Sequence, residues 1–156
     1  MSIQLINQYY NKRDRIIQYG GSTNELTIRD PFKDLLNHYS DKKNLLLIPE
    51  LAIMGTKGAK VKPDGTLKNA LRLDYGYWES KDEKDSIDEE IDTKIKKGYP
   101  LTNIIFEDGQ TAVLIQHGVV VSRVDMNDRN KLDEILNQFI SFEHPQVKEL
   151  LIKLLV

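Results

Sequence analysis

Two acidic residues and a lysine stand at spacings that could form one reactive site. Asp64 follows Pro63, and the stretch Glu79-Ser80-Lys81 begins 15 positions later. Carboxylates supply the oxygen ligands that Mg²⁺ prefers, and a lysine ammonium can hold an attacking water nearby. These residue types suit metal-dependent hydrolysis of a phosphodiester, although a β-hairpin with a polar face would also contain them.

Strand geometry decides whether these side chains can meet. In a strand, alternate side chains share a face, so Glu79 and Lys81 would point the same way, and the backbone carbonyl of Ser80 could add a ligand between them. A hairpin that turns around residues 69–74 would set Asp64 across from Glu79. We therefore expect Asp64 to complete the acidic pair.

Asp74 is the alternative second carboxylate. It stands five positions before Glu79, so in one continuous strand the two side chains would face opposite ways. Asp74 could still meet Glu79 if Gly76 and Tyr77 formed a tight two-residue turn. The sequence favours Asp64 and leaves Asp74 open.

The composition is that of an ordinary globular domain. The chain has 156 residues, 40% of them hydrophobic and 29% charged, which predicts one domain with its own core. The sequence contains no cysteine, which excludes disulfides and fits a reducing cytoplasm. The apolar runs are too short to span a bilayer, and the N-terminus lacks a secretory pattern. We expect a cytoplasmic protein without a membrane partner.

Charge is distributed unevenly along the chain. The net charge of −2 argues against a surface that binds nucleic acid everywhere. Positive residues gather between Lys57 and Arg72, whereas the segment from Glu79 to Asp92 contains eight acidic residues and two lysines. A basic patch beside carboxylates suits an enzyme that acts on a polyanion. Two solvated faces of opposite sign would explain the same pattern more simply.

The first half of the chain predicts two helices followed by strands. Apolar residues over 3–19 follow a helical stripe. Ser22 and Glu25 stand at the spacing of a capping box, so a second helix is expected there, kinked near Pro31. An irregular strand and then a pair of strands are expected over residues 44–54 and 58–82.

The second half predicts a helix, several strands and two closing helices. Ile87, Ile91 and Ile95 give residues 86–98 a helical face, which we expect to pack rather than to contribute to a site. Asp108-Gly109 predicts a turn between two strands, and a third short strand follows. The closing helices are expected over residues 128–142 and 144–156, with Pro145 near the start of the second. This alternation predicts an α/β domain with a mixed central sheet flanked by helices.

These residues and this order of elements resemble the PD-(D/E)XK nucleases. Pro63-Asp64-Gly65 followed by Glu79-Ser80-Lys81 matches the motif of that family, and the elements resemble its αβββαβ core with extra C-terminal strands and helices. The longer run from PDGTL to GQTAVL looks like the N-terminal, Mrr-like nuclease domain of Type ISP restriction-modification enzymes, which are single-polypeptide Type I enzymes. The resemblance covers about residues 20–120.

The resemblance implies a Mg²⁺-dependent endodeoxyribonuclease in which Mn²⁺ can substitute. Asp64 matches the family's metal-binding aspartate, Glu79 its second acidic ligand and Lys81 its catalytic lysine. Glu25 resembles an additional helix glutamate that would also face the metal. The glutamine that related nucleases place before a tyrosine is missing, because Lys94 or Lys96 precedes Tyr99 instead, and this departure leaves the role of the 86–98 helix open.

The resemblance also implies partners. Such a domain acts on double-stranded DNA and is joined to an ATP-driven translocase, a methyltransferase and a target-recognition domain. We expect residues 1–156 to be a single nuclease domain and a fragment of a larger multidomain enzyme, because the chain ends in the apolar segment ELLIKLLV. It has no G-x-x-x-x-G-K-[ST] loop for ATP phosphates. The alternative is an inactive nuclease-like module that binds DNA or docks a partner.

Overall fold

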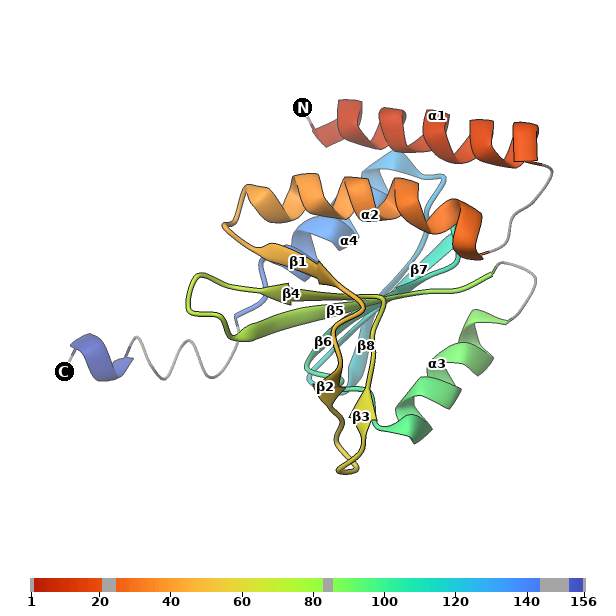
Figure 1. Ribbon diagram of the computed structural model, residues 1–156. Helices are drawn as coiled ribbons and strands as arrows, with labels where there is room; N and C mark the ends of the chain where they lie inside the picture. Colours follow the sequence, from red (N-terminus) through yellow and green to blue (C-terminus); the bar gives the residue numbers. More distant parts are fainter. Residues whose placement is uncertain (1, 21–24, 83–85, 144–151, 156) are drawn as a thin grey trace.

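A mixed six-stranded sheet lies between helices in the computed structural model of the chain (Figure 1). The structure describes residues 2–20, 25–82, 86–143 and 152–155, with the backbone alone at 25–28. The helices are α1 (Ser2–Gly20), α2 (Glu25–Asp41), α3 (Ile87–Lys97) and α4 (Arg129–Ile140). The strands are β1 (Leu46–Pro49), β2 (Ile53–Met54), β3 (Lys60–Val61), β4 (Gly65–Lys68), β5 (Asp74–Ser80), β6 (Asn103–Glu107), β7 (Thr111–Gln116) and β8 (Val119–Asp125).

The strand order in the sheet is β1-β4-β5-β6-β7-β8. Strands β5 and β6 run parallel, and the other neighbouring pairs are antiparallel. Parallel neighbours need a long connection, which here contains α3. From α2 onward the elements of the main sheet and its helices follow the predicted order of helix, three strands, helix and strand. The predicted mixed α/β fold is thereby confirmed.

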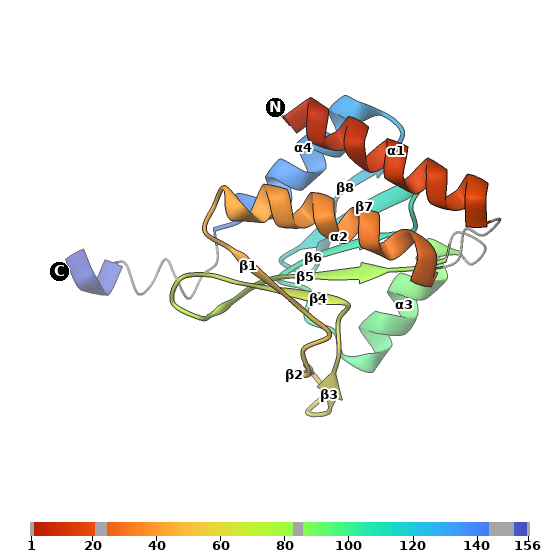
Figure 2. The same ribbon diagram turned by 45° about the horizontal axis from the view of Figure 1, so that its top comes forward.

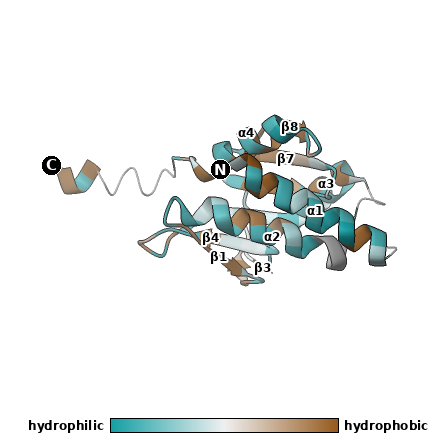
Figure 3. Cartoon of the chain, turned by 90° about the horizontal axis from the view of Figure 1, so that it is seen from above, coloured by the Kyte–Doolittle hydropathy of each residue, from teal (hydrophilic) through white to brown (hydrophobic). Residues whose placement is uncertain are grey.

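Helices cover both faces of the sheet. Helices α1, α2 and α4 pack together over one face, and α3 covers the other (Figure 1). Each face has its own cluster of buried side chains, with Trp78 in the first and Tyr77 in the second. Viewed from above, α1 and α2 carry both apolar and polar segments, as expected for helices with one buried side (Figure 3). Adjacent residues of β5 therefore serve opposite cores.

The expected strand over residues 44–54 is divided between two sheets, which corrects the prediction. Strand β1 ends at Pro49, and β2 pairs with β3 in a separate two-stranded ribbon (Figure 2). Pro49 has no N–H for a ladder, and Glu50 adopts a left-handed φ of 51°. These two residues turn the chain out of the main sheet.

The predicted helices agree with the structure where it describes them. Ser86 caps α3 by accepting a hydrogen bond from the Glu89 N–H, and Gly98 ends this helix with a φ of 93°. Pro31 lies within α2, which continues on both sides of it. The proposed cap at Ser22 lies outside the described residues, as does most of the last expected helix, of which residues 152–155 are helical. None of the described helices has the length and apolarity to cross a membrane.

Candidate active site

The β4–β5 hairpin brings Asp64 and Glu79 together. Gly65 pairs with Trp78 in this ladder, so the residue before β4 lies opposite Glu79. The Asp64 N–H donates to Glu79 Oε1 at 2.8 Å, and the Ser80 N–H donates to Asp64 Oδ2 at 2.8 Å. Each carboxylate is thus fixed by a backbone group of the opposite strand. This is the geometry that the hairpin argument predicts for Asp64.

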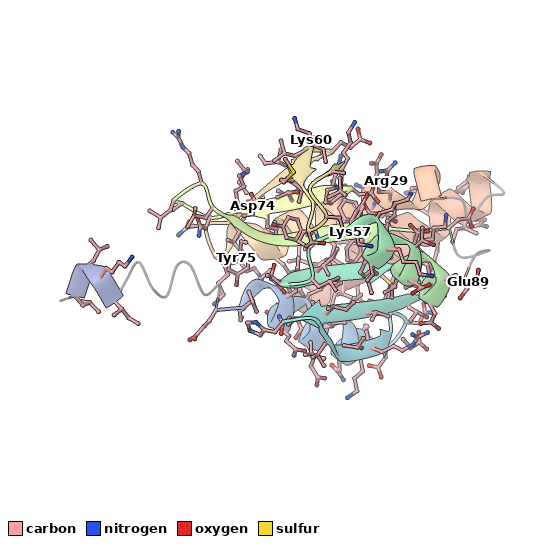
Figure 4. The ribbon with its side chains drawn as sticks, turned by 90° about the horizontal axis from the view of Figure 1, so that it is seen from below. Arg29, Lys57, Lys60, Asp74, Tyr75 and Glu89 are labelled. Carbon is pink, nitrogen blue, oxygen red and sulfur yellow. The ribbon has the colours of Figure 1, made fainter. Side chains whose placement is uncertain are left out.

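Asp74 does not join this pair. Strand β5 runs without a turn through Gly76 and Tyr77, which puts Asp74 and Glu79 at opposite ends of it, roughly 17 Å apart at ordinary strand rise. Asp74 accepts hydrogen bonds from Lys68 Nζ at 2.6 Å and from the Tyr77 hydroxyl at 3.2 Å. Figure 4 shows Asp74 well separated from Arg29, which contacts Asp64. The alternative that placed Asp74 beside Glu79 is wrong.

Both carboxylates of the pair are withdrawn from solvent. The Glu79 side chain is 4% exposed and the Asp64 side chain 13%. Burial, together with the neighbouring Asp64 charge, raises the pKa of Glu79 to about 8. Burial also raises the pKa of Asp64, against the opposing effects of the Ser80 N–H and Arg29. Two desolvated acids in contact are costly to hold, and such pairs are typical of functional sites.

Two cations face the acidic pair from different helices. Arg29 of α2 donates from Nη1 to Asp64 Oδ1 at 2.7 Å, and Lys94 of α3 places Nζ 3.3 Å from Glu79 Oε2. Lys94 also lies over the ring of Tyr99, with Nζ 4.9 Å from its centre. Burial lowers the pKa of Lys94, but the Glu79 charge and other neighbours raise it overall. The protein therefore supplies a counter-charge to each carboxylate of the pair.

Lys81 contacts Glu90 of α3. It follows β5 directly, and its Nζ lies 3.5 Å from Glu90 Oε2, whereas Glu90 Oε1 lies 3.4 Å from Lys94 Nζ. Helix α3 packs as expected through Ile87 and Ile91, but it also brings Glu90 and Lys94 into contact with the candidate site. Their i, i+4 spacing beside the buried Ile87 and Ile91 is the signal that could have identified them.

A second buried acid supports the end of β5. The Ser80 hydroxyl donates to Glu107 Oε1 at 2.8 Å, and the Gly109 N–H donates to Glu107 Oε2 at 3.1 Å. The Lys81 N–H donates to the backbone carbonyl of Glu107 at 2.8 Å. Burial raises the pKa of Glu107 to about 8. Ser80 thereby links the acidic pair to the neighbouring strand β6.

The acidic pair fits a hard divalent cation. Mg²⁺ usually takes one or two carboxylates and completes its shell with water and substrate oxygens. The raised pKa values of Asp64 and Glu79 reflect desolvation that a divalent charge between them would offset. Among the described residues no group of three or more potential ligands is assembled. Glu25 is the first residue of α2, and its side chain lies outside what the structure describes.

A pocket of about 210 Å³ opens beside Asp64. Its walls include Arg29 and Lys33 from α2, and Glu50 and Trp78 from the sheet side. A larger pocket of about 430 Å³ lies between α1 and α2, but its lining contains a single acidic residue, Asp34. The chemistry therefore points to the smaller pocket.

Comparisons with known proteins give matches among solved structures. The chain is similar to part of the chain in the cryoEM structure of a DrdV–DNA complex, at 46% sequence identity and a TM-score of 0.91. The similarity covers 94% of this chain and 14% of that one. A more distant likeness, to the type IIG restriction endonuclease BpuSI, has 13% identity and a TM-score of 0.48 over 76% of this chain and 17% of that one. No protein-family model matches the sequence, and curated proteins give no significant match.

The close match to DrdV extends over nearly all of the chain. The chain spans only 14% of the DrdV chain, so the two agree as domains and not as whole proteins. The match agrees with the restriction-endonuclease-like core expected from the sequence. The chain has the fold of a restriction-enzyme nuclease-like domain.

Proposed function

We propose that this chain is a metal-dependent DNA endonuclease domain that hydrolyses phosphodiester bonds. The observation that carries the proposal is the buried pair of Asp64 and Glu79, held together by hydrogen bonds across the β4–β5 hairpin. The similarity to part of a protein solved in complex with DNA supports a DNA substrate.

Asp64 and Glu79 would hold Mg²⁺, or Mn²⁺ in its place. The bound ion would supply positive charge to offset the charge that develops on the scissile phosphate. Lys81 is proposed to orient the attacking water, as the family motif implies. Its ammonium is within reach of Glu90, which keeps it at the same end of β5 as the acidic pair.

The basic residues between Lys57 and Arg72 are proposed to contact the DNA backbone. The structure separates them into two groups, because Lys57 and Lys60 lie on the β2–β3 ribbon and Lys68 and Arg72 lie at the far turn of the β4–β5 hairpin. The ribbon returns to the main sheet just before Asp64, and it carries Lys57 beside α3, whereas Lys60 lies farther from this helix (Figure 4). We assign the backbone contacts nearest the cut to the ribbon.

The parent enzyme is proposed to be an ATP-driven restriction-modification enzyme of the Type ISP kind, with an Mrr-like nuclease domain, acting in the cytoplasm. The similarity of this chain to a small part of a much longer chain supports a role as one module among several. The translocase, methyltransferase and target-recognition domains would deliver the nuclease to its site. The isolated domain should then cut DNA weakly and without sequence preference.

A plasmid nicking assay tests the proposal. The wild-type chain should nick supercoiled DNA with Mg²⁺ or Mn²⁺ and not in excess chelator, and Lys81→Ala should remove most of this activity. Lys43→Ala is the matched control, because Lys43 is exposed in the turn after α2. Equal activity of the wild type and Lys81→Ala would refute the assignment of Lys81.

An inactive nuclease-like module is the second candidate. One observation favours it. Arg29 pairs with Asp64 and Lys94 pairs with Glu79, as in a purely structural ion-pair network. Such a module would bind DNA in a salt-dependent manner without metal-dependent cleavage. Calorimetric titration with Mn²⁺ separates the two, because only the nuclease should bind the ion and lose binding in Asp64→Asn.

A further inference from the structure

We propose that Arg29 and Lys94 are resident counter-cations that compete with the divalent ion for the acidic pair and pass to DNA phosphates when the ion binds. This inference rests on the proposed function, since it concerns the same two carboxylates. Nothing in the family motif assigns either residue. The argument comes from the contacts of each cation.

Each cation is placed on a different oxygen of the pair. Arg29 Nη1 lies 2.7 Å from Asp64 Oδ1, and Lys94 Nζ lies 3.3 Å from Glu79 Oε2. The remaining oxygens, Asp64 Oδ2 and Glu79 Oε1, accept backbone N–H groups. The two oxygens without a backbone donor are therefore the ones that face a cation, and they are the ones left to ligate a metal.

The two cations are themselves partly desolvated. The Arg29 and Lys94 side chains are each 17% exposed, so their charges are weakly screened by solvent. A divalent ion entering the same space would face strong repulsion from both of them. Metal binding must therefore be weakened as long as the cations keep their positions.

Each cation also has a second carboxylate nearby, with which it can pair after leaving the acidic pair. Arg29 lies 3.8 Å from Glu50 Oε1 at the pocket beside Asp64, and Lys94 lies 3.4 Å from Glu90 Oε1. An arginine fork and a lysine ammonium are also the groups that bind phosphates. A phosphate brought to the acidic pair would meet both. The two cations thus stabilise the carboxylates before the divalent ion binds, and they hold the substrate phosphate afterwards.

Metal affinity without DNA is the first test. Isothermal titration of the full chain with Mn²⁺ should give roughly three- to tenfold tighter binding in Arg29→Gln and in Lys94→Gln, because a repelling charge is removed. Lys43→Gln, in the exposed turn after α2, and Lys97→Gln, at the end of α3, are matched controls and should stay within about twofold of wild type. Unchanged or weaker binding in both test variants would overturn the proposal. Circular dichroism confirms that each variant is folded.

Salt dependence of DNA binding is the second test. With Ca²⁺ present, the slope of log affinity against log salt for a short duplex should fall by about 0.9 in each test variant. Without a divalent ion, each test variant should have the same slope as the wild type, because Arg29 and Lys94 of the wild type then stay paired with the carboxylates and do not contact DNA. An equal decrease in slope with and without Ca²⁺ would show that the two cations do not move from the carboxylates to DNA phosphates when the ion binds.

Failure of this inference can be told apart from failure of the proposed function. If Asp64→Asn leaves Mn²⁺ binding intact, the metal site itself is wrongly placed and both proposals fall. If Asp64→Asn abolishes binding while Arg29→Gln and Lys94→Gln bind as the wild type does, only the counter-cation inference falls.

Discussion

The two ends of strand β5 carry similar residues in very different surroundings. At its start, Asp74 pairs with Lys68, and the two side chains are 29% and 30% exposed. At its end, Glu79 pairs with Lys94, and the Glu79 side chain is 4% exposed. Beside the first pair, the Tyr77 hydroxyl donates to Asp74, whereas the second pair adjoins a further carboxylate, Asp64. Residue type alone does not distinguish these ends, but burial beside a like charge does.

The largest expected difference between the two ends is in catalysis. Asp64→Asn and Glu79→Gln should each lower the rate of plasmid nicking by roughly 10²- to 10³-fold, because the proposed divalent ion would lose a ligand. Asp74→Asn should leave the rate within about twofold, since its side chain is far from the pair. Initial rates at saturating Mn²⁺ provide the measurement. A comparable loss in Asp74→Asn would invalidate the distinction.

The next difference is in the dependence of stability on pH. Folded Glu79 keeps its proton up to about pH 8, whereas an ordinary glutamate loses it near 4.5. Between these values the folded state binds more protons than the unfolded state, so the free energy of unfolding falls as the pH rises. Without metal, Glu79→Gln should be more stable than wild type by roughly 1 to 3 kcal/mol at pH 9, and the gain should vanish below pH 4.

Urea unfolding at pH 5, 7 and 9 in the presence of chelator measures this gain. Asp74→Asn serves as the control, and it should show no comparable rise in stability at pH 9. A Glu79→Gln variant that is less stable than wild type at every pH would contradict the burial argument.

A smaller effect is expected for the support beneath the buried end. Ser80→Ala removes the hydroxyl that donates to Glu107 and leaves this buried acid with one partner fewer. The variant should lose about 1 to 2 kcal/mol of unfolding free energy. Ser122→Ala, on the edge strand β8, should change stability by less than about 0.5 kcal/mol. Chemical denaturation at pH 7 compares the two, and equal stabilities would show that Ser80 does not support the site.

The smallest effect belongs to the exposed end. A double-mutant cycle of Lys68→Ala and Asp74→Ala should give a coupling energy of about 0.2 to 1 kcal/mol, because the pair is partly solvated. The coupling should decrease further in 0.5 M salt. A coupling energy above about 2 kcal/mol would mean that the Lys68–Asp74 pair interacts more strongly than a partly solvated ion pair should, and the contrast with the buried end would fail.

The acidic pair was predictable from the sequence because it depends on local geometry. Strand alternation and a turn near residues 69–74 are enough to place Asp64 opposite Glu79. The Asp74 alternative arose because Gly76 resembles a turn residue. In the structure Gly76 instead permits close packing, since a Cβ there would lie 2.9 Å from both Asn103 Nδ2 and Phe139 Cε1. A glycine required by packing and one required by a turn cannot be distinguished in one sequence.

The counter-cations were not predictable, because they depend on how helices dock on the sheet. Arg29 is 35 residues from Asp64 in the sequence, and no local pattern links them. Lys94 was visible as part of a helix, but its approach to Glu79 depends on how α3 packs against β6, the strand beside β5. The outward turn at Glu50 likewise depends on a backbone conformation that its residue type does not indicate.

The chain leaves the main sheet at Glu50 and returns to it at Asp64, and the segment between them forms the β2–β3 ribbon. The Glu50 N–H donates to the Asp64 carbonyl at 3.1 Å, so the chain leaves and returns at one closed point. The β2–β3 ribbon between these residues pairs with no strand of the main sheet. The ribbon also contacts the end of α3, because the Thr56 N–H donates to the Gly98 carbonyl and Lys57 Nζ donates to the Lys96 carbonyl. Only its open tip around Gly58 could therefore change while Asp64 keeps its place. The tip of the ribbon is thus a position where a different segment could be exchanged without disturbing the hairpin that holds the acidic pair.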